Sequence, residues 1–345
     1  MKSNLFIFCI LIILFKTGNV LSNENIFNVD NIEINKGNSL NKEKIANNAF
    51  KKGYIKLINR LLLEKDFKQL SKTNLNQIKK LISHYQITGI DKQTNKIKVN
   101  IFFDKEKVHN YFYVKNILYS DIVNTDVVFF PLLVMNNEYF IYSKNYFVEN
   151  WNLGSLENLI QYILPLESIE NIQKIEKHKD KLMSMDLSDF FQEYSMKKNL
   201  IFATVEIKND KAKIFLKTKI EGKKINKTLE VDNENFSQEM FNDKVILEIK
   251  KLIEDLIKSQ NLIDVRTPSF LNVKMNLKKN NSLVEFDSRL RKIDLIDNFY
   301  VQQLNKDYVL LKIRYLGKID KIINKLKDQN INLKMTEGQW QMNII

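Results

Sequence analysis

The feature that most constrains the fold is an uninterrupted apolar run near the middle of the chain, at residues 127–134. The run is rich in valine and phenylalanine, which favour strands over helices. A strand whose consecutive side chains are all apolar must be covered on both faces, as at the centre of an α/β sheet. The run therefore predicts a central α/β module, to which we assign residues 126–266.

The rest of the central module shows further strand and helix patterns. We expect a hairpin return at 139–142, strands at 200–207, 211–220 and 225–231, and helices at 155–163, 186–194 and 238–258. The last of these helices has apolar residues three and four apart along its length, which is typical of a helix that buries one face.

An N-terminal module is predicted at residues 23–125, with the order strand, helix, helix, strand, strand, helix. In its first strand the apolar phase changes between Val29 and Ile32, which predicts a bulge or a twist. Asp104 stands where a side chain would cap the last helix.

A C-terminal module is predicted at residues 267–345, because Pro268 disfavours a helix before it. The patterns that follow give strand, helix, strand, strand, helix, strand, which is the ferredoxin-like (split βαβ) order, with one added terminal strand. The predicted fold class is therefore α+β or α/β, with three small modules in series.

The start of the chain has the pattern of a secretory signal peptide. A basic residue precedes an apolar run at 5–15, and Val20 and Ser22 occupy the minus-three and minus-one positions of a cleavage site. Cleavage between Ser22 and Asn23 would remove residues 1–22. The run is too short to cross a bilayer, which needs about 20 apolar residues.

The alternative is an uncleaved anchor in the inner membrane, with Lys16 at the membrane surface. Cys9 is the only cysteine of the chain and lies in the signal segment, so the mature chain would lack cysteine. Disulfides, thiolate metal sites and a cysteine nucleophile are thereby excluded for the exported protein.

The formal charge of +13 comes mostly from lysines that are scattered along the chain. One strand concentrates them, because alternation in 211–220 places four lysines and a phenylalanine on one face: Lys211, Lys213, Phe215, Lys217 and Lys219. Such a face could bind an anionic polymer or lipid headgroups. The competing interpretation is a solvated sheet surface in a lysine-rich chain.

Motifs that carry catalysis or cofactors are missing from the sequence. The three histidines, His84, His109 and His178, lack the spacing of metal ligands, and the glycines are too sparse for a phosphate-binding loop. We therefore expect no metal and no cofactor. Three carboxylate pairs remain as candidates for acid–base chemistry: Asp186/Asp189, Glu167/Glu170 and Asp294/Asp297. Trp151 and Trp340 are expected to be core or hairpin anchors.

Three stretches resemble one family of exported bacterial proteins, the family called domain of unknown function 2066. They are residues 97–104, the run at 127–134 with Trp151 downstream, and residues 311–317 with the closing Trp340. The resemblance implies a Gram-negative source and a periplasmic location. It brings no catalytic residues with it.

These observations predict a periplasmic, non-enzymatic protein that binds a macromolecule or takes part in assembly. Its partner would be an envelope protein or an anionic polymer, and no nucleic acid is expected. The alternative is a hydrolase of a cell-wall or surface polymer that uses one of the carboxylate pairs.

Overall fold

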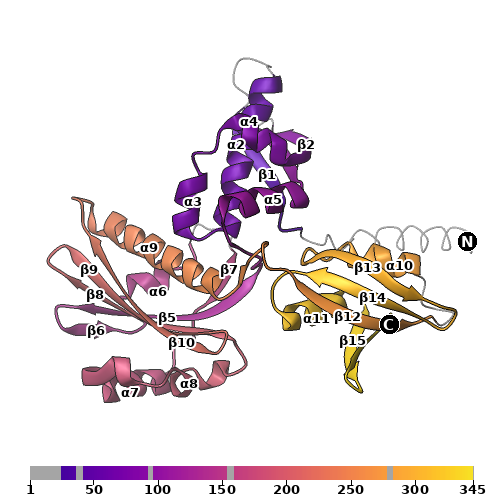
Figure 1. Cartoon of the computed structure of the whole chain (residues 1–345). Coiled ribbons are helices and arrows are strands. Elements are labelled where there is room, and N and C mark those ends of the chain that lie inside the picture. Colours follow the sequence, from indigo (N-terminus) through magenta and orange to yellow (C-terminus); the bar gives the residue numbers. More distant parts are fainter. Residues whose placement is uncertain (1–24, 36–41, 92–95, 154–158, 278–282, 345) are drawn as a thin grey trace, which may run out of the picture. The chain divides into compact units, whose positions relative to one another are not determined.

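The computed structural model describes residues 25–35, 42–91, 96–153, 159–277 and 283–344 (Figure 1). They form two compact units. Unit 1 comprises the described residues up to Leu57, Thr73–Ile117 and the described residues from Asp264 onward. Unit 2 comprises Ile58–Lys72 and Leu118–Ile263.

Both units combine helices with sheets, which confirms the α+β prediction at that level. No helix within the described ranges is both long enough and apolar enough to cross a membrane. The predicted signal peptide, residues 1–22, and its cleavage point before Asn23 lie outside the described residues.

Unit 2 is built on one sheet, with strands β5 (Thr125–Met135), β6 (Glu138–Phe140), β7 (Ile160–Ile163), β8 (Asn199–Lys208), β9 (Lys211–Ile220) and β10 (Lys223–Asp232). The strand order is β10-β9-β8-β5-β6, and β7 also pairs with β5. β5 runs parallel to both β7 and β8, and seven consecutive residues of β5 are buried. The prediction of a central strand that is covered on both faces is therefore confirmed.

Helices cover the two faces of this sheet (Figure 1). On one face lie α6 (Tyr146–Asn150) and α9 (Gln238–Ser259), and on the other lie α7 (Ile169–Lys177) and α8 (Leu187–Phe190). The 3-10 helices η1 (Lys179–Ser184) and η2 (Gln192–Tyr194) contribute Leu182 and Tyr194 to the apolar core of this second face. Each face has its own apolar core: Phe129 of β5 belongs to one core, and its neighbour Phe130 belongs to the other. The unit also contains a small antiparallel pair of strands, β4 (Tyr119–Ser120) and β11 (Leu262–Ile263).

The prediction of a helix at 155–163 is wrong for the second half of this range, because Ile160–Ile163 forms the strand β7. Residues 154–158 lie outside the described part. In β7, Ile160 and Tyr162 are buried while Gln161 is exposed, and the strand pairs in parallel with the start of β5. A short apolar run has no periodicity that separates a strand from a helix, so the pairing with β5 decides.

Pro131 lies in β5 at a point where one edge of the strand has no backbone partner. β7 pairs with residues 125–128 and β6 with residues 133–135. The buried side chain of Asn145 lies at this interval, where its amide nitrogen donates to the carbonyls of Pro131, Phe140 and Ile141 at 2.8, 2.8 and 3.1 Å. One side chain thus replaces the missing strand pairing.

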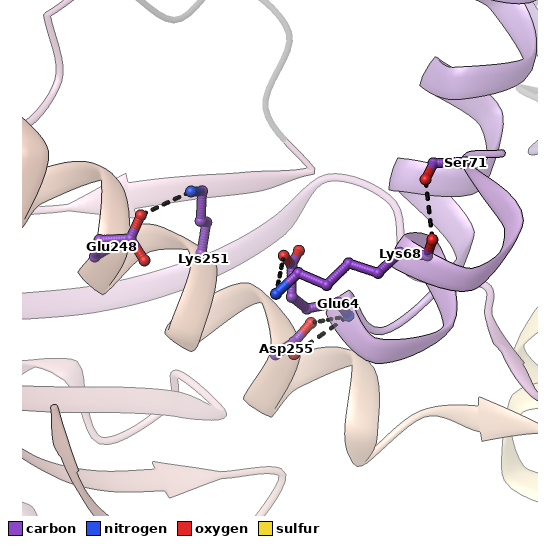
Figure 2. A network of polar contacts seen from close by, with 6 residues as sticks. All are labelled: Glu64, Lys68, Ser71, Glu248, Lys251 and Asp255. Atoms are coloured by element: carbon purple, nitrogen blue, oxygen red, sulfur yellow. Dashed lines mark hydrogen bonds and ion pairs between the residues drawn. The ribbon is translucent and has the colours of Figure 1, made fainter.

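The same unit contains the turn between α2 (Lys42–Leu61) and α3 (Glu64–Leu70), which packs on α9. The buried ammonium of Lys258 donates to the carbonyls of Asn59 and Leu62. The carboxylate of Asp255 accepts from the backbone N–H of Glu64, with 3.0 Å between Oδ1 and nitrogen (Figure 2). A cation at the end of one helix and an anion at the start of the next are the favourable placements for both helix dipoles.

The N-terminal part of unit 1 has a three-stranded antiparallel sheet of β1 (Asn28–Asn35), β2 (Ile82–Asp91) and β3 (Lys96–Phe103), in the order β1-β3-β2. The same part of unit 1 contains the helices α4 (Leu75–Leu81) and α5 (Lys105–Lys115). The register of β1 shifts between Val29 and Ile32, which confirms the predicted bulge. Asp104 accepts from the backbone N–H of Lys107 at 3.1 Å and caps α5 as predicted.

The C-terminal part of unit 1 has a five-stranded sheet of β12 (Ser269–Asn276), β13 (Ile296–Leu304), β14 (Tyr308–Tyr315), β15 (Ile331–Thr336) and β16 (Gln339–Ile344). Its helices are α10 (Leu283–Leu290) and α11 (Ile319–Asp328). The strand order is β13-β14-β12-β16-β15, with β16 parallel to β12. The terminal strand is thus inserted between β12 and β15, which would be neighbours in a four-stranded ferredoxin-like sheet.

Candidate functional site

The predicted basic strand face lies on β9 in unit 2. Its five residues, Lys211, Lys213, Phe215, Lys217 and Lys219, share one face, and the residues between them are buried. Three of the lysines already have partners in the fold. Lys211 pairs with Asp232 at 3.0 Å, Lys217 donates to the carbonyl of Met185, and Lys219 donates to the hydroxyl of Ser188 at 3.3 Å.

The strands beside β9 add acidic residues to the same surface. Lys213 lies opposite Glu206 of β8 and Glu230 of β10. Its ammonium lies over the ring of Phe215, 5.1 Å from the centroid. The surface is therefore a mosaic of both charges, and a binding role for these lysines stays a prediction.

The carboxylate pairs offer little for acid–base chemistry. Asp186 accepts hydrogen bonds from Lys224 at 2.9 Å and from the backbone N–H of Ser188 at 2.7 Å. These bonds, with Lys224 the larger cause, lower the pKa of Asp186 to about 2. A general acid must still hold its proton near neutral pH, and a lowered pKa makes Asp186 unsuited to that role. In the pair Asp294/Asp297, Asp297 forms an ion pair with Arg314 at 3.0 Å, while Glu167 and Glu170 are both exposed.

The three histidines lie apart from one another. Burial lowers the pKa of His109 to about 4, and its ring meets Phe27 edge to face at 5.3 Å. His84 stacks on Phe102 at 4.3 Å, and Nδ1 of His178 lies 2.8 Å from a backbone carbonyl of α7. Across the described ranges, no group of three or more His, Cys, Asp or Glu residues could hold a metal ion.

The tryptophans differ in burial. Trp151 is fully buried and stacks on Phe129 with 3.9 Å between ring centroids, which confirms it as a core residue. Trp340 is half-buried on β16, in the β15–β16 hairpin, opposite Met335. The ring of Trp151 is therefore inaccessible to a ligand.

A more promising surface is one face of the C-terminal sheet in unit 1. On β12 and β14 every second residue is buried, with Leu271, Val273 and Met275 on one strand and Val309, Leu311 and Ile313 on the other. The alternate residues point to the opposite side. We call that surface the open face; it comprises Phe270, Asn272, Lys274, Asn276, Asn298, Tyr300, Gln303, Tyr308, Leu310, Lys312, Arg314, Asn332, Lys334, Thr336, Gln339, Gln341 and Asn343.

Two lysines of the open face lie over aromatic rings from the neighbouring strand. The ammonium of Lys312 on β14 is 4.5 Å from the ring centroid of Phe270 on β12. The ammonium of Lys274 on β12 is 4.4 Å from that of Tyr308 on β14. Phe270 is still 51% exposed. Lysines and aromatic rings therefore lie side by side on this surface, and Phe270 remains accessible to a ligand.

The open face carries cations, amides and aromatic rings but no carboxylate of its own. Its cations are Lys274, Lys312, Arg314 and Lys334. Asp297 occupies a bulge of β13 beside the open face and is paired with Arg314. Asp307 and Glu337 lie in the turns at the ends of the strands. The open face itself carries four cations and no carboxylate, so it is complementary to an anion.

The sequence contains the signal for this surface, although our sequence analysis assigned no role to it. In residues 270–276 and 308–314 an aromatic ring, a lysine and polar residues alternate with buried aliphatics. Each strand alone gives an ordinary amphipathic pattern. Only the register of β12 with β14 brings each ring to a lysine of the other strand.

Comparison of the whole chain with the models of known protein families finds no match. Comparison with curated proteins finds no related sequence either. The resemblance to domain of unknown function 2066 therefore stays a prediction.

Proposed function

We propose that the chain is an exported, non-enzymatic protein of the bacterial envelope that binds another macromolecule through the open face. The observation that carries the proposal is the composition of that face, where exposed rings and four cations gather with one neutralised acid. Rings that are half-exposed and surrounded by polar groups are typical of binding surfaces.

The periplasmic location and the family resemblance belong to the same proposal and rest on sequence patterns. So does the division into three modules at 23–125, 126–266 and 267–345. The last module would be a variant of the split βαβ arrangement in which β16 separates β12 from β15. Such a variant presents a wider sheet than four strands would, with more surface for a partner.

The alternative, a hydrolase of a surface polymer, has weaker support. The pair Asp186/Asp189 contains a carboxyl whose pKa is lowered, where a general acid needs a raised one. The carboxylate of Asp297 forms an ion pair with Arg314. The open face itself offers no carboxylate to serve as an acid or a base.

Site-specific photo-crosslinking tests the proposal. The tagged full-length chain carries a photo-reactive phenylalanine in place of Tyr300 on the open face, or in place of Leu247 on α9 as a control that is equally exposed (47% and 52%). We expect a high-mass adduct in irradiated cells at Tyr300 but not at Leu247, on a chain that starts at Asn23. The absence of an adduct at Tyr300, or equal adducts at both positions, would contradict the proposed binding surface.

A further inference from the structure

We infer that the open face binds a linear anionic polysaccharide, which spans two equivalent subsites that each consist of an aromatic ring and a lysine. The inference deepens the proposed function and rests on it. One subsite is Phe270 with Lys312, and the other is Tyr308 with Lys274, at ammonium-to-centroid distances of 4.5 and 4.4 Å.

The two subsites are related by the register of the central strands. Val273 lies opposite Leu311 in the antiparallel pair of β12 and β14. Phe270 and Tyr308 each stand three residues before that pair, and Lys274 and Lys312 each stand one residue after it. A two-fold axis through the pair, perpendicular to the sheet, therefore exchanges the subsites. A ligand with a repeating unit can satisfy both in the same way.

The distance between the subsites requires a ligand longer than one unit. Phe270 lies opposite Arg314, and Tyr308 lies opposite Asn276, six residues further along β12. At about 3.3 Å per residue, the two rings start from backbone positions roughly 20 Å apart. A single sugar cannot reach both, whereas a chain can, and the second contact then forms at a high effective concentration.

The chemistry of each subsite suits an acidic sugar. The face of an aromatic ring is electron-rich, so the polarised C–H bonds on the flat side of a pyranose pack against it. The adjacent ammonium can then bind the carboxylate or sulfate of the same sugar. In the structure that ammonium rests on the ring, and an anionic sugar would draw it outward.

The polar residues around the subsites provide hydrogen bonds for hydroxyl groups. Asn272 lies opposite Lys312, and Gln341 lies opposite Lys274. Side-chain amides donate and accept at once, as sugar hydroxyls do. Single-stranded nucleic acid also combines flat rings with negative charge. The expected export of the chain favours a polysaccharide over nucleic acid.

Binding of galacturonan, a polymer of an acidic sugar, provides the test, with the full mature chain and fluorescently labelled probes. We expect a 12-residue galacturonan to bind with an affinity that falls as salt is raised. The galacturonate monomer should bind at least tenfold more weakly than the 12-residue galacturonan. The same holds for the methyl-esterified 12-mer, which keeps the sugar rings but lacks the negative charge. A 12-nucleotide oligothymidylate serves as the nucleic-acid probe and should also bind more weakly than galacturonan.

Two matched double variants separate the subsites. Phe270→Ala/Lys312→Gln and Tyr308→Ala/Lys274→Gln should each lower the affinity for the 12-mer about tenfold, and by similar factors, because the subsites are equivalent. Lys251→Gln on α9 removes one positive charge, as each double variant does, from a residue outside both predicted surfaces, and should leave binding unchanged. Circular dichroism and thermal unfolding confirm that each variant is folded.

The outcomes distinguish this inference from the proposed function. Tighter binding of oligothymidylate than of galacturonan would overturn the polysaccharide and leave the open face as the binding surface. A loss at only one subsite would overturn their equivalence. No binding of either probe, together with a Tyr300 adduct in cells, would overturn the inference alone, whereas the additional absence of that adduct would remove the proposed function as well.

Discussion

Lys258 and Asp255 lie three residues apart on α9 and hold the two ends of one interhelical turn. Lys258 donates to the carbonyl of Leu62 at 2.9 Å and pairs with Glu254 at 2.6 Å, while Asp255 accepts from the backbone N–H of Glu64 at 3.0 Å. The charges complement the end of α2 and the start of α3. This explains why a lysine that is only 2% exposed is tolerated inside unit 2.

Replacing Lys258 with methionine should therefore destabilise the protein. The substitution keeps the volume of the side chain but leaves buried carbonyls without a donor and Glu254 without its partner. We expect a loss of about 3 kcal/mol in the free energy of unfolding, as is usual when one member of a buried pair is removed. Urea denaturation measures it. Lys251→Met, which removes an exposed lysine on the same helix, is the control and should cost less than 1 kcal/mol.

A second prediction about stability concerns Asn145. Its amide donates to three backbone carbonyls and its oxygen caps the start of α6, at 3.1 Å from the nitrogen of Phe147. Asn145→Ala leaves several buried groups unpaired, each worth about 1–3 kcal/mol, so we expect a total loss near 3 kcal/mol after partial relaxation. Asn150→Ala removes a single bond to Tyr146 from a half-buried site and is the matched control. Equal effects of both substitutions in urea denaturation would contradict this account of Asn145.

Because His109 is buried, we expect the stability of unit 1 to depend on pH. Burial lowers its pKa from 6.5 to about 4, so the unfolded chain binds a proton that the folded chain rejects between these values. Stability from this group is therefore complete above about pH 6.5 and is lost as the pH falls toward 4. The shift corresponds to about 3 kcal/mol at most. Urea denaturation at pH 7 and pH 5 should show a drop in wild type that is smaller in His109→Gln.

The parts of the fold that were predictable are those that a local pattern decides. The apolar run predicts β5, the phase change predicts the bulge after Val29, and Asp104 predicts its helix cap. β7 was not predictable, because the four residues from Ile160 become a strand only through pairing with β5. The roles of Lys258 and Asn145 also depend on chain segments that are distant in sequence, such as Leu62 and Pro131.

The candidate site shows the same limit. On β9 the sequence correctly predicts which residues share a face, but it cannot show that Glu206 and Glu230 lie beside Lys213. On β12 the sequence predicts that Phe270 and Lys274 share a face, but it cannot show that Lys312 and Tyr308 of β14 lie beside them. A surface is the sum of several strands, and its charge is known only once their register is fixed.

Asp186 leads to the last prediction, which also bears on the hydrolase alternative. Lys224 and the N–H of Ser188 lower the pKa of Asp186 from 3.8 to about 2, so its contribution to stability is present above pH 3.8 and is lost as the pH falls toward 2. Asp186→Asn keeps a cap for α8 and removes the titration. Thermal unfolding from pH 4.5 to 3 should therefore show a steeper decline for wild type than for Asp186→Asn. Lys224→Gln should flatten the profile in part, because the bond from the N–H of Ser188 remains. It should add nothing to Asp186→Asn, since that substitution already removes the titrating carboxyl. A carboxyl NMR titration that gave Asp186 a pKa above 5 would contradict this account and restore the residue as a candidate general acid.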